Sequence, residues 1–154
     1  MKYISNSEKD TIELGKKIAS QLQIGDIIIL SGDLGSGKTK LTEGILTYFN
    51  LQDEISSPTF TIVNEYDTEK IKIFHFDVYR LADVDEFFAI GGEEYFEKGI
   101  CLIEWGELIE DALPFQYIHI SFKKPENEPD SRLLKVDALG QKYETILDKL
   151  KEEI

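Results

Sequence analysis

The sequence predicts an α/β fold in which helices cover both sides of a mixed, mostly parallel central sheet. Short, almost wholly apolar runs at 26–31 and 100–103 are typical of strands buried on both faces. Segments with apolar residues at helical spacing alternate with these runs, as in a three-layer sandwich. The 154 residues, 42% of them hydrophobic, suffice for one core, so we expect residues 1–154 to form a single domain.

The predicted elements follow one another without a repeat or an obvious linker. Ser7 with Asp10 three residues later has the spacing of a helix start, and Gly25 is typical of a stop. The polar residues 67–70 between two apolar segments predict a hairpin. We expect helices over 7–24, 38–49, 83–90, 93–98 and 141–153, and strands over 26–31, 60–66, 71–77, 100–103, 117–122 and 133–138.

The composition argues against several classes of protein. A net charge of −13 disfavours direct binding of tRNA or DNA and docking on an anionic membrane, but it permits a small anionic ligand held by local donors. Cys101 is the one cysteine, so no intramolecular disulfide forms. No apolar run approaches the roughly 18 residues of a membrane span, and the first residues lack a signal-peptide pattern. We therefore expect a cytoplasmic protein.

The acidic residues are concentrated in one segment. Residues 83–111 contain ten Asp and Glu against one basic residue, Lys98, and so carry −9 of the net charge. Such a run is ordinarily a solvated face. It also suits docking against a basic patch of a partner protein, and the sequence leaves both interpretations open.

The glycine-rich loop carries a phosphate-binding motif. Residues 32–39, Gly-Asp-Leu-Gly-Ser-Gly-Lys-Thr, match the pattern G-x-x-x-x-G-K-[ST] between a predicted strand and a predicted helix. Backbone N–H groups of such a loop converge on phosphate oxygens at a helix N-terminus. Lys38 is expected to reach the β- and γ-phosphates and Thr39 to bind Mg²⁺. The other expected cradle residues are Asp33, Leu34, Gly35, Ser36 and Gly37. The motif in this context predicts a P-loop NTPase-like fold.

Two carboxylates that end apolar strands are candidates for the metal site. Glu104 and Asp77 are both expected at the carboxyl edge of the sheet, where either would bind Mg²⁺ or orient the attacking water. His75 shares a strand face with Asp77 by alternation, so it either supports that carboxylate or is structural. Thr59, in the loop after the second helix, is either a hydroxyl that senses the γ-phosphate or part of an ordinary turn.

In combination, these segments resemble the TsaE (YjeE) family of small bacterial P-loop ATPases of tRNA threonylcarbamoyladenosine biosynthesis. The resemblance extends from the amino-terminal helix to about Arg132. It rests on the P-loop, Ser57-Pro58-Thr59-Phe60, His75-Phe76-Asp77-Val78-Tyr79-Arg80-Leu81 and Ile103-Glu104-Trp105. The chain departs from the family pattern at Gly106, where a proline commonly follows the tryptophan, and this leaves the position of Glu107 open.

The resemblance implies a role for each site residue. Thr39 and Glu104 would hold Mg²⁺, and Asp77 would lie near the metal or the attacking water. Trp105 would be a functional neighbour of the site. The residues implied in catalysis are Lys38, Asp77, Glu104 and Trp105. The residues implied near the base or the ribose are Glu8, Glu107 and Arg132.

The resemblance also implies the activity and the partners. It implies a Mg²⁺-dependent ATPase, forming ADP and phosphate, that binds the TsaB- and TsaD-like subunits of the threonylcarbamoyl-transferase complex and contacts tRNA only indirectly. No second basic residue is evident in the site, so we expect slow hydrolysis without partners. Two alternatives share the P-loop. A small-molecule or nucleoside kinase usually has an arginine-bearing lid over the phosphates. Residues 82–111 contain no arginine, so the sequence gives little support for such a lid. A nucleotide-dependent binding module would lack significant hydrolysis.

Overall fold

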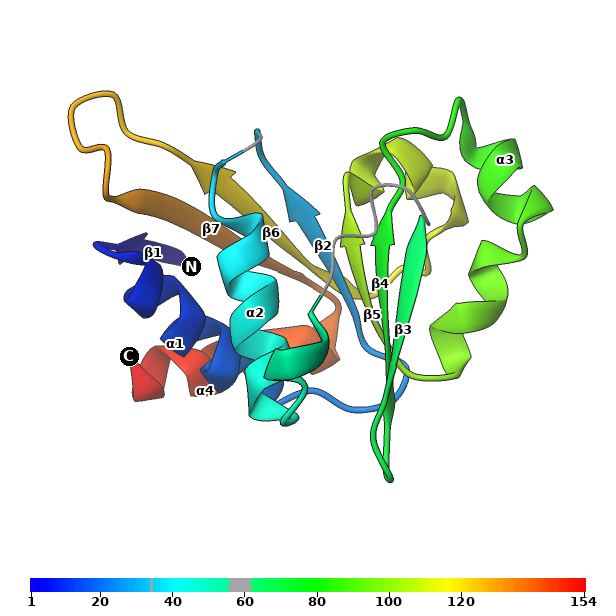
Figure 1. Ribbon diagram of the computed structural model, residues 1–154, viewed down its shortest axis with the longest axis horizontal. Coiled ribbons are helices and arrows are strands. Elements are labelled where there is room, and N and C mark those ends of the chain that lie inside the picture. Colours follow the sequence, from blue (N-terminus) through cyan, green and yellow to red (C-terminus); the bar gives the residue numbers. More distant parts are fainter. Residues whose placement is uncertain (34, 56–61) are drawn as a thin grey trace.

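The computed structural model describes residues 1–33, 35–55 and 62–154 and forms one seven-stranded sheet with helices on both faces (Figure 1). The strands are β1 (Lys2–Ser5), β2 (Ile27–Ser31), β3 (Val63–Asp67), β4 (Lys72–Asp77), β5 (Ile100–Glu104), β6 (Tyr117–Lys123) and β7 (Arg132–Leu139). The helices are α1 (Glu8–Ala19), α2 (Lys38–Tyr48), α3 (Val84–Ala89) and α4 (Gln141–Glu153), with short 3₁₀ segments η1 (Gln52–Glu54), η2 (Gly92–Glu97) and η3 (Gly106–Ala112).

The sheet order is β1-β7-β6-β2-β5-β4-β3. The four central strands, from β6 to β4, pair in parallel, and the pairs outside them are antiparallel. The predicted α/β class with a mixed, centrally parallel sheet is therefore confirmed. The predicted hairpin is confirmed as well, because β3 and β4 are antiparallel neighbours. Since β2, β4 and β5 run in the same direction, their carboxyl ends meet at one edge of the sheet.

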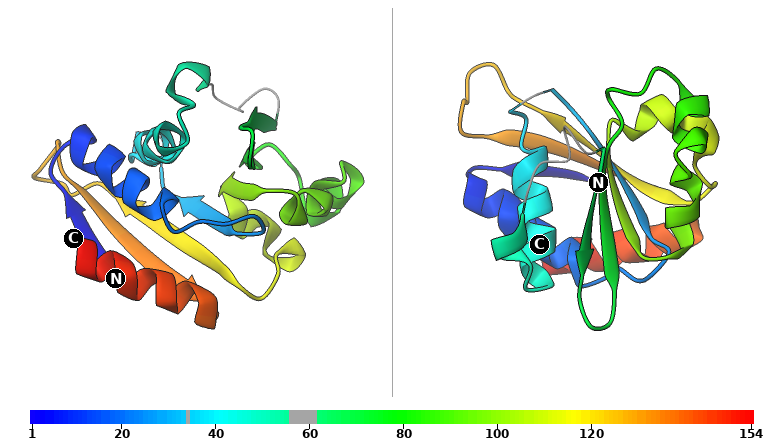
Figure 2. Two further views of the ribbon diagram at one scale, coloured as in Figure 1. Left: turned by 90° about the horizontal axis from the view of Figure 1, so that it is seen from below. Right: turned by 45° about the vertical axis from the view of Figure 1, so that its right-hand side comes forward.

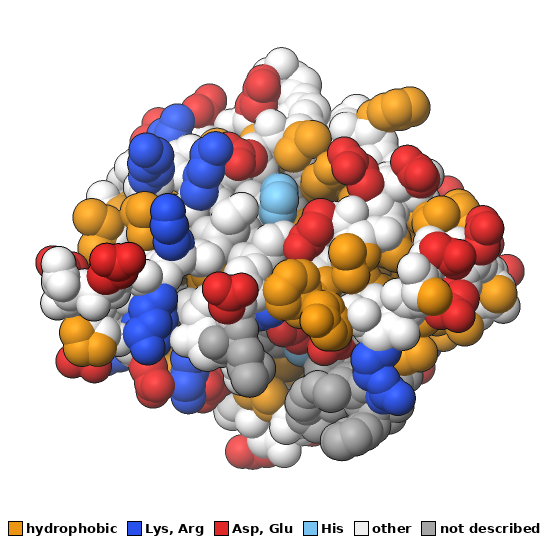
Figure 3. All heavy atoms as spheres, turned by 90° about the horizontal axis from the view of Figure 1, so that it is seen from above, with side chains coloured by type: hydrophobic (Ala, Val, Ile, Leu, Met, Phe, Trp, Pro, Cys, Tyr) orange, Lys and Arg blue, Asp and Glu red, His pale blue; other side chains and the backbone are white. Residues whose placement is uncertain are grey.

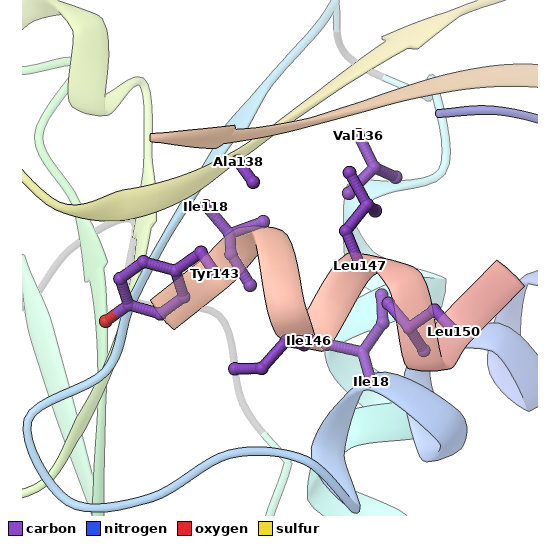
Figure 4. A pocket seen from close by; sticks show the side chains of 8 residues that line it. All are labelled: Ile18, Ile118, Val136, Ala138, Tyr143, Ile146, Leu147 and Leu150. Atoms are coloured by element: carbon purple, nitrogen blue, oxygen red, sulfur yellow. The ribbon is translucent and has the colours of Figure 1, made fainter. Parts of the chain in front are cut away.

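One face of the sheet packs against α1, α2 and α4. Ser7 caps α1 as predicted, since its hydroxyl accepts a hydrogen bond from the Asp10 N–H at 3.1 Å. The helix ends at Ala19, six residues before Gly25. The inner side of α4 packs on β6, β7 and α1 (Figure 4). The side chains that meet there are Ile18, Ile118, Val136, Ala138, Tyr143, Ile146, Leu147 and Leu150.

A buried carboxylate anchors α4 to the start of β2. The Asp26 side chain is fully buried and accepts hydrogen bonds from the Gln23 N–H at 2.7 Å and the Tyr143 hydroxyl at 3.0 Å. Its Oδ1 also lies 2.5 Å from Lys142 Nζ. Burial, and then the Asp26 charge, raise the pKa of Tyr143. This network fixes the strand that leads into the glycine-rich loop.

The opposite face of the sheet is covered by α3, η2 and η3, which lie at the end away from α1 and α4 (Figure 2). Phe74, Phe76 and Phe87 are its largest fully buried side chains, and together with Ile27 and Ile29 they belong to a second core cluster. These elements contain the acidic segment 83–111. The structure therefore places the segment that carries −9 of the net charge of −13 mainly on this side of the molecule.

Strand β1 was not predicted from the sequence. It is four residues long and pairs with the edge strand β7, with Lys2 opposite Lys135 and Ser5 opposite Arg132. Only Ser5 among its residues is buried, so it shows no hydrophobic alternation. In the described ranges, no helix is long and apolar enough to span a membrane.

Candidate functional site

A cleft of about 1240 Å³ opens at the carboxyl edge of the parallel strands. Figure 3 looks down on this edge of the molecule. The starts of α1 and α2 line one side of the cleft, and the ends of β4 and β5 line the other. Ten of the residues predicted from the sequence line it, namely Glu8, Asp33, Gly35, Gly37, Lys38, Thr39, Asp77, Glu104, Trp105 and Arg132. Residues as far apart in the chain as Glu8 and Arg132 thus meet in one place.

The glycines of the loop are required by its backbone. Gly32, Gly35 and Gly37 all have positive φ, at 150°, 79° and 113°. A Cβ on Gly32 would lie 2.8 Å from Ser36 Oγ, whereas a Cβ on Gly35 would meet nothing within 4 Å. Gly35 therefore borders open space. The Ser36 hydroxyl is buried and has no hydrogen-bond partner among the residues that the structure describes. A loop with an unused donor at a helix start fits an anionic group.

Lys38 extends into the cleft against an aromatic ring. Its side chain is buried, and its Nζ lies 4.4 Å from the centroid of the Trp105 ring. It forms no ion pair with any residue that the structure describes. Trp105 has a positive φ of 63°, and its ring also contacts that of Tyr79, with centroids 5.0 Å apart. Trp105 thus packs against a buried lysine that has no ion-pair partner within residues 1–33, 35–55 and 62–154.

Asp77 and Glu104 are directly opposite each other on adjacent parallel strands. Both project to the sheet face that carries α2. Asp77 Oδ1 accepts a hydrogen bond from the Tyr79 N–H at 3.1 Å. His75 Nε2 lies 2.7 Å from Glu104 Oε2. The suggestion that His75 supports Asp77 is therefore corrected, because the register places its ring next to the carboxylate of the neighbouring strand.

Basic side chains other than Lys38 also line the cleft, which corrects the expectation that none is present. They are Lys9, Lys40 and Arg132. Arg132 donates to the Pro129, Ser131 and Gly35 carbonyls at 2.6, 2.8 and 3.3 Å, so it ties the β6–β7 loop to the P-loop. The hydrogen bond and charge of Glu43, followed by the charge of Glu8, raise the pKa of Lys40. Arg132 thus already donates hydrogen bonds to backbone carbonyls, and Lys40 already forms ion pairs with Glu8 and Glu43.

Four predicted site residues are not seen lining the cleft. Leu34 and Thr59 lie outside the described residues. Ser36 is buried within the loop and does not line the cleft. Glu107 is on the other face of the sheet, where its Oε2 accepts a hydrogen bond at 2.5 Å from Ser31 Oγ, which also contacts His119 Nε2 at 2.8 Å.

The chain's departure from the family pattern at Gly106 has a packing reason. A Cβ on Gly106 would lie 2.5 Å from Ile29 Cδ1, so the turn after β5 packs its backbone directly on β2. The residue is buried, and the turn starts from the positive φ of Trp105. The sequence showed the missing proline but not this contact, because Ile29 lies 77 positions earlier in the chain.

The oxygen atoms of the cleft suit a magnesium ion that is shared with phosphates. Thr39, Asp77 and Glu104 all line it, and hydroxyl and carboxylate oxygens are the hard ligands that Mg²⁺ prefers. Among the described residues, no group of three or more His, Cys, Asp and Glu side chains is arranged to hold a metal ion. Mg²⁺ is commonly held by one or two carboxylates plus the phosphates of a nucleotide, and the cleft offers two carboxylates and a hydroxyl for such a site.

Comparison with known proteins assigns the family. The model of the family described as "Threonylcarbamoyl adenosine biosynthesis protein TsaE" matches residues 5–133. The chain belongs to the TsaE family. The tRNA threonylcarbamoyladenosine biosynthesis protein TsaE of Bacillus subtilis strain 168 is 36% identical over 151 residues, covering 97% of this chain and 93% of that protein. The protein of the same name from Treponema pallidum is 38% identical over 124 residues, covering 80% and 91%.

A solved TsaE-like structure supports the same fold. The chain in "Crystal structure of Bacillus subtilus YdiB" superposes with a TM-score of 0.80 at 31% identity, covering 99% of this chain and 95% of that one. The matched range of the TsaE model ends at 133, just after Arg132, close to where the sequence motifs ended. The family match therefore contains every candidate site residue, while most of β7 and all of α4 lie beyond it.

Proposed function

We propose that this TsaE-family chain binds ATP with Mg²⁺ and hydrolyses it to support tRNA threonylcarbamoyladenosine biosynthesis. The observation that carries the proposal is that a P-loop, its lysine and two strand-end carboxylates line one cleft. The pathway follows from the names of the TsaE relatives in Bacillus subtilis and Treponema pallidum. ATP is chosen over GTP because of the family resemblance, and the chain contains no Asn-Lys-x-Asp element.

The residues of the cleft have separate proposed roles in phosphoryl transfer. The P-loop N–H groups and Lys38 would bind the phosphates, and Thr39 with Glu104 or Asp77 would hold Mg²⁺. Bound Mg²⁺ supplies positive charge where negative charge builds on the phosphate oxygens. The remaining carboxylate would orient the attacking water. Because no described residue forms an ion pair with Lys38, phosphate oxygens could pair with it without displacing one of those residues.

Phosphate release and nucleotide binding test this activity. The wild type is expected to bind ATP and to release phosphate only with Mg²⁺, and Lys38→Ala is expected to lose most of its nucleotide affinity. Lys151→Ala, an exposed lysine on α4, is the matched control and should behave as the wild type. Nucleotide binding without phosphate release would indicate a binding module. Transfer of phosphate to a small acceptor instead of water would indicate a kinase.

We further propose that the chain acts on a complex of TsaB- and TsaD-like subunits, with tRNA contacted only through them. The support is the family, the net charge of −13 and the concentration of acidic residues over α3, η2 and η3. On the face shown in Figure 3, most of the visible Lys and Arg side chains gather on the left, away from the acidic residues grouped at the right. An acidic side next to the ATP cleft suits a basic partner surface.

Co-purification with the two subunits, in the presence of nucleotide and Mg²⁺, tests the partner assignment. Charge reversal at Glu93, Glu94 and Glu97, all exposed on η2, is expected to weaken the complex and to leave nucleotide affinity unchanged. The matched control reverses three exposed acidic residues of α4, namely Glu144, Asp148 and Glu152. If both triple variants bind the partners as the wild type does, the acidic segment is only a solvated face.

A further inference from the structure

The contact between His75 and Glu104 stands out among the polar contacts of the molecule. The His75 ring is on β4, and only 5% of the residue is exposed. Its Nε2 lies 2.7 Å from Glu104 Oε2 on β5, and its other nitrogen, Nδ1, is buried without a hydrogen-bond partner in the described part of the chain. Within the described residues, the only hydrogen bond of the His75 ring is thus the one to Glu104 Oε2.

The chemistry of the pair fixes the direction of the hydrogen bond. An ionised carboxylate can only accept, so the hydrogen must be on Nε2. The arrangement with the hydrogen on Nδ1 would leave a buried N–H unpaired and would set an Nε2 lone pair against the carboxylate. His75 Nε2 is therefore the donor, and its ring, packed in the sheet, holds Oε2 of Glu104.

With this contact, each of the two strand-end carboxylates has one hydrogen-bonded oxygen. His75 engages one oxygen of Glu104, and the Tyr79 N–H engages one oxygen of Asp77. Among the described residues nothing donates to the second oxygen of either group. A glutamate side chain has one more rotatable bond than an aspartate side chain. A hydrogen bond to one oxygen of Glu104 therefore matters more for keeping its other oxygen in a fixed position. Carboxylates that bind metal ions are commonly held in place by a hydrogen bond from a neighbouring group, and His75 is placed to supply one to Glu104.

We propose that His75 is a positioning residue that holds Glu104 with one oxygen free to bind Mg²⁺ beside the P-loop. The inference deepens the proposed function and rests on it. The role is to orient a metal ligand, so loss of the Nε2 donor should weaken Mg²⁺ binding while leaving the phosphate cradle intact. It also distinguishes Glu104 from Asp77, whose hydrogen-bond partner in the described residues is the backbone N–H of Tyr79 and not a side chain.

Two substitutions separate this role from a merely structural one. In His75→Gln the side-chain amide nitrogen can occupy the position of Nε2, and in His75→Asn it lies near the position of Nδ1. His119→Gln is the matched control, because His119 is the other histidine of the chain and contacts Ser31 on the opposite face of the sheet. Thermal unfolding of each variant shows that the compared proteins are folded.

The readout is the Mg²⁺ dependence of ADP binding, followed by the fluorescence of Trp105, the single tryptophan. His75→Asn is expected to raise the half-saturating Mg²⁺ concentration by about 10- to 100-fold, and His75→Gln to restore it to within about threefold of the wild type. ADP affinity in EDTA should be unchanged. His75→Asn with the Mg²⁺ dependence of the wild type would overturn the inference alone. A wild type whose ADP binding ignores Mg²⁺ would overturn the proposed function as well.

A measurement on the unaltered protein covers the case in which His75→Asn does not fold. Nitrogen NMR of the imidazole groups reports which ring nitrogen carries the hydrogen, and His119→Gln assigns the two signals. The expected result is a His75 ring that carries a hydrogen on Nε2. A ring with its hydrogen on Nδ1 would contradict the inference, because such a ring cannot donate to Glu104.

Discussion

The contact between α1 and α2 depends on two glycines, and Gly44→Ala tests how closely these helices must approach. A Cβ on Gly44 would lie 2.1 Å from the Ile12 carbonyl oxygen, and one on Gly15 would lie 2.5 Å from the Leu41 carbonyl oxygen. An ordinary carbon–oxygen contact is about 3.3 Å, so the helices would have to separate by about 1 Å. Since both obstacles are backbone atoms, no side-chain rotation relieves the overlap.

The expected cost follows from two opposing terms. Overpacking of a core costs up to about 3 kcal/mol, and a rigid backbone obstacle calls for the upper end of that range. Replacement of glycine by alanine inside a helix stabilises the folded state by about 1 kcal/mol through helix propensity. The net loss is about 2 kcal/mol in the free energy of unfolding, which lowers the Tm of a chain of this size by about 4–8 °C.

Thermal and urea unfolding followed by circular dichroism measure this loss. Gly15→Ala should change the Tm in the same direction, because it introduces the reciprocal overlap. Lys149→Ala, an exposed position on α4, is the control and should stay within about 0.5 kcal/mol of the wild type. A Tm of Gly44→Ala at or above that of the wild type would refute the reasoning.

Three further predictions concern the site and the core. Glu104→Ala is expected to lower the rate of phosphate release by about 100-fold or more while changing nucleotide affinity little, and the reverse pattern in the two assays would assign Glu104 to binding. Burial raises the pKa of the Cys101 thiol to about 12, so iodoacetamide at pH 8 should modify the native protein far more slowly than the urea-unfolded protein; equal rates would place the thiol at the surface. Burial and the Asp26 charge raise the pKa of Tyr143 in the folded state, so its contribution to stability is complete below the unfolded pKa of about 10 and is lost as the pH rises further. The Tm of the wild type should therefore fall more steeply above pH 10 than that of Tyr143→Phe, and parallel curves would contradict this assignment.

The parts of the fold that depend on local sequence were predictable. The capping Ser7, the glycines with positive φ in the P-loop and the uninterrupted apolar strand β2 all act within a few residues, so each is visible in the sequence itself. The hairpin of β3 and β4 follows from the same kind of local signal. By contrast, β1 is four residues long and exists because β7 offers it an edge, so nothing in its own sequence marks it.

The internal contacts of the site depend on strand register, which the sequence does not contain. Alternation placed His75 on the same face as Asp77, but the pairing of β4 with β5 brings its ring to Glu104. Glu107 is close to Glu104 in sequence, yet the turn at Trp105 and the packing of Gly106 on Ile29 place it on the other face of the sheet. Positions near a motif are therefore poor guides to the site when a tight turn separates them.

The most direct test of the account is ATP turnover by the purified chain with and without the TsaB- and TsaD-like subunits, in the presence of Mg²⁺. The cleft is lined by a P-loop and two carboxylates. Its Arg132 side chain is hydrogen-bonded to the Gly35 carbonyl and its Lys40 side chain is paired with Glu8 and Glu43, so neither is available to stabilise the transferring phosphate. We therefore expect slow release of phosphate by the chain alone and a marked increase when the two subunits are added, both abolished by Lys38→Ala. Equal rates with and without the subunits would contradict the proposal that ATP hydrolysis in this cleft serves the transferase complex.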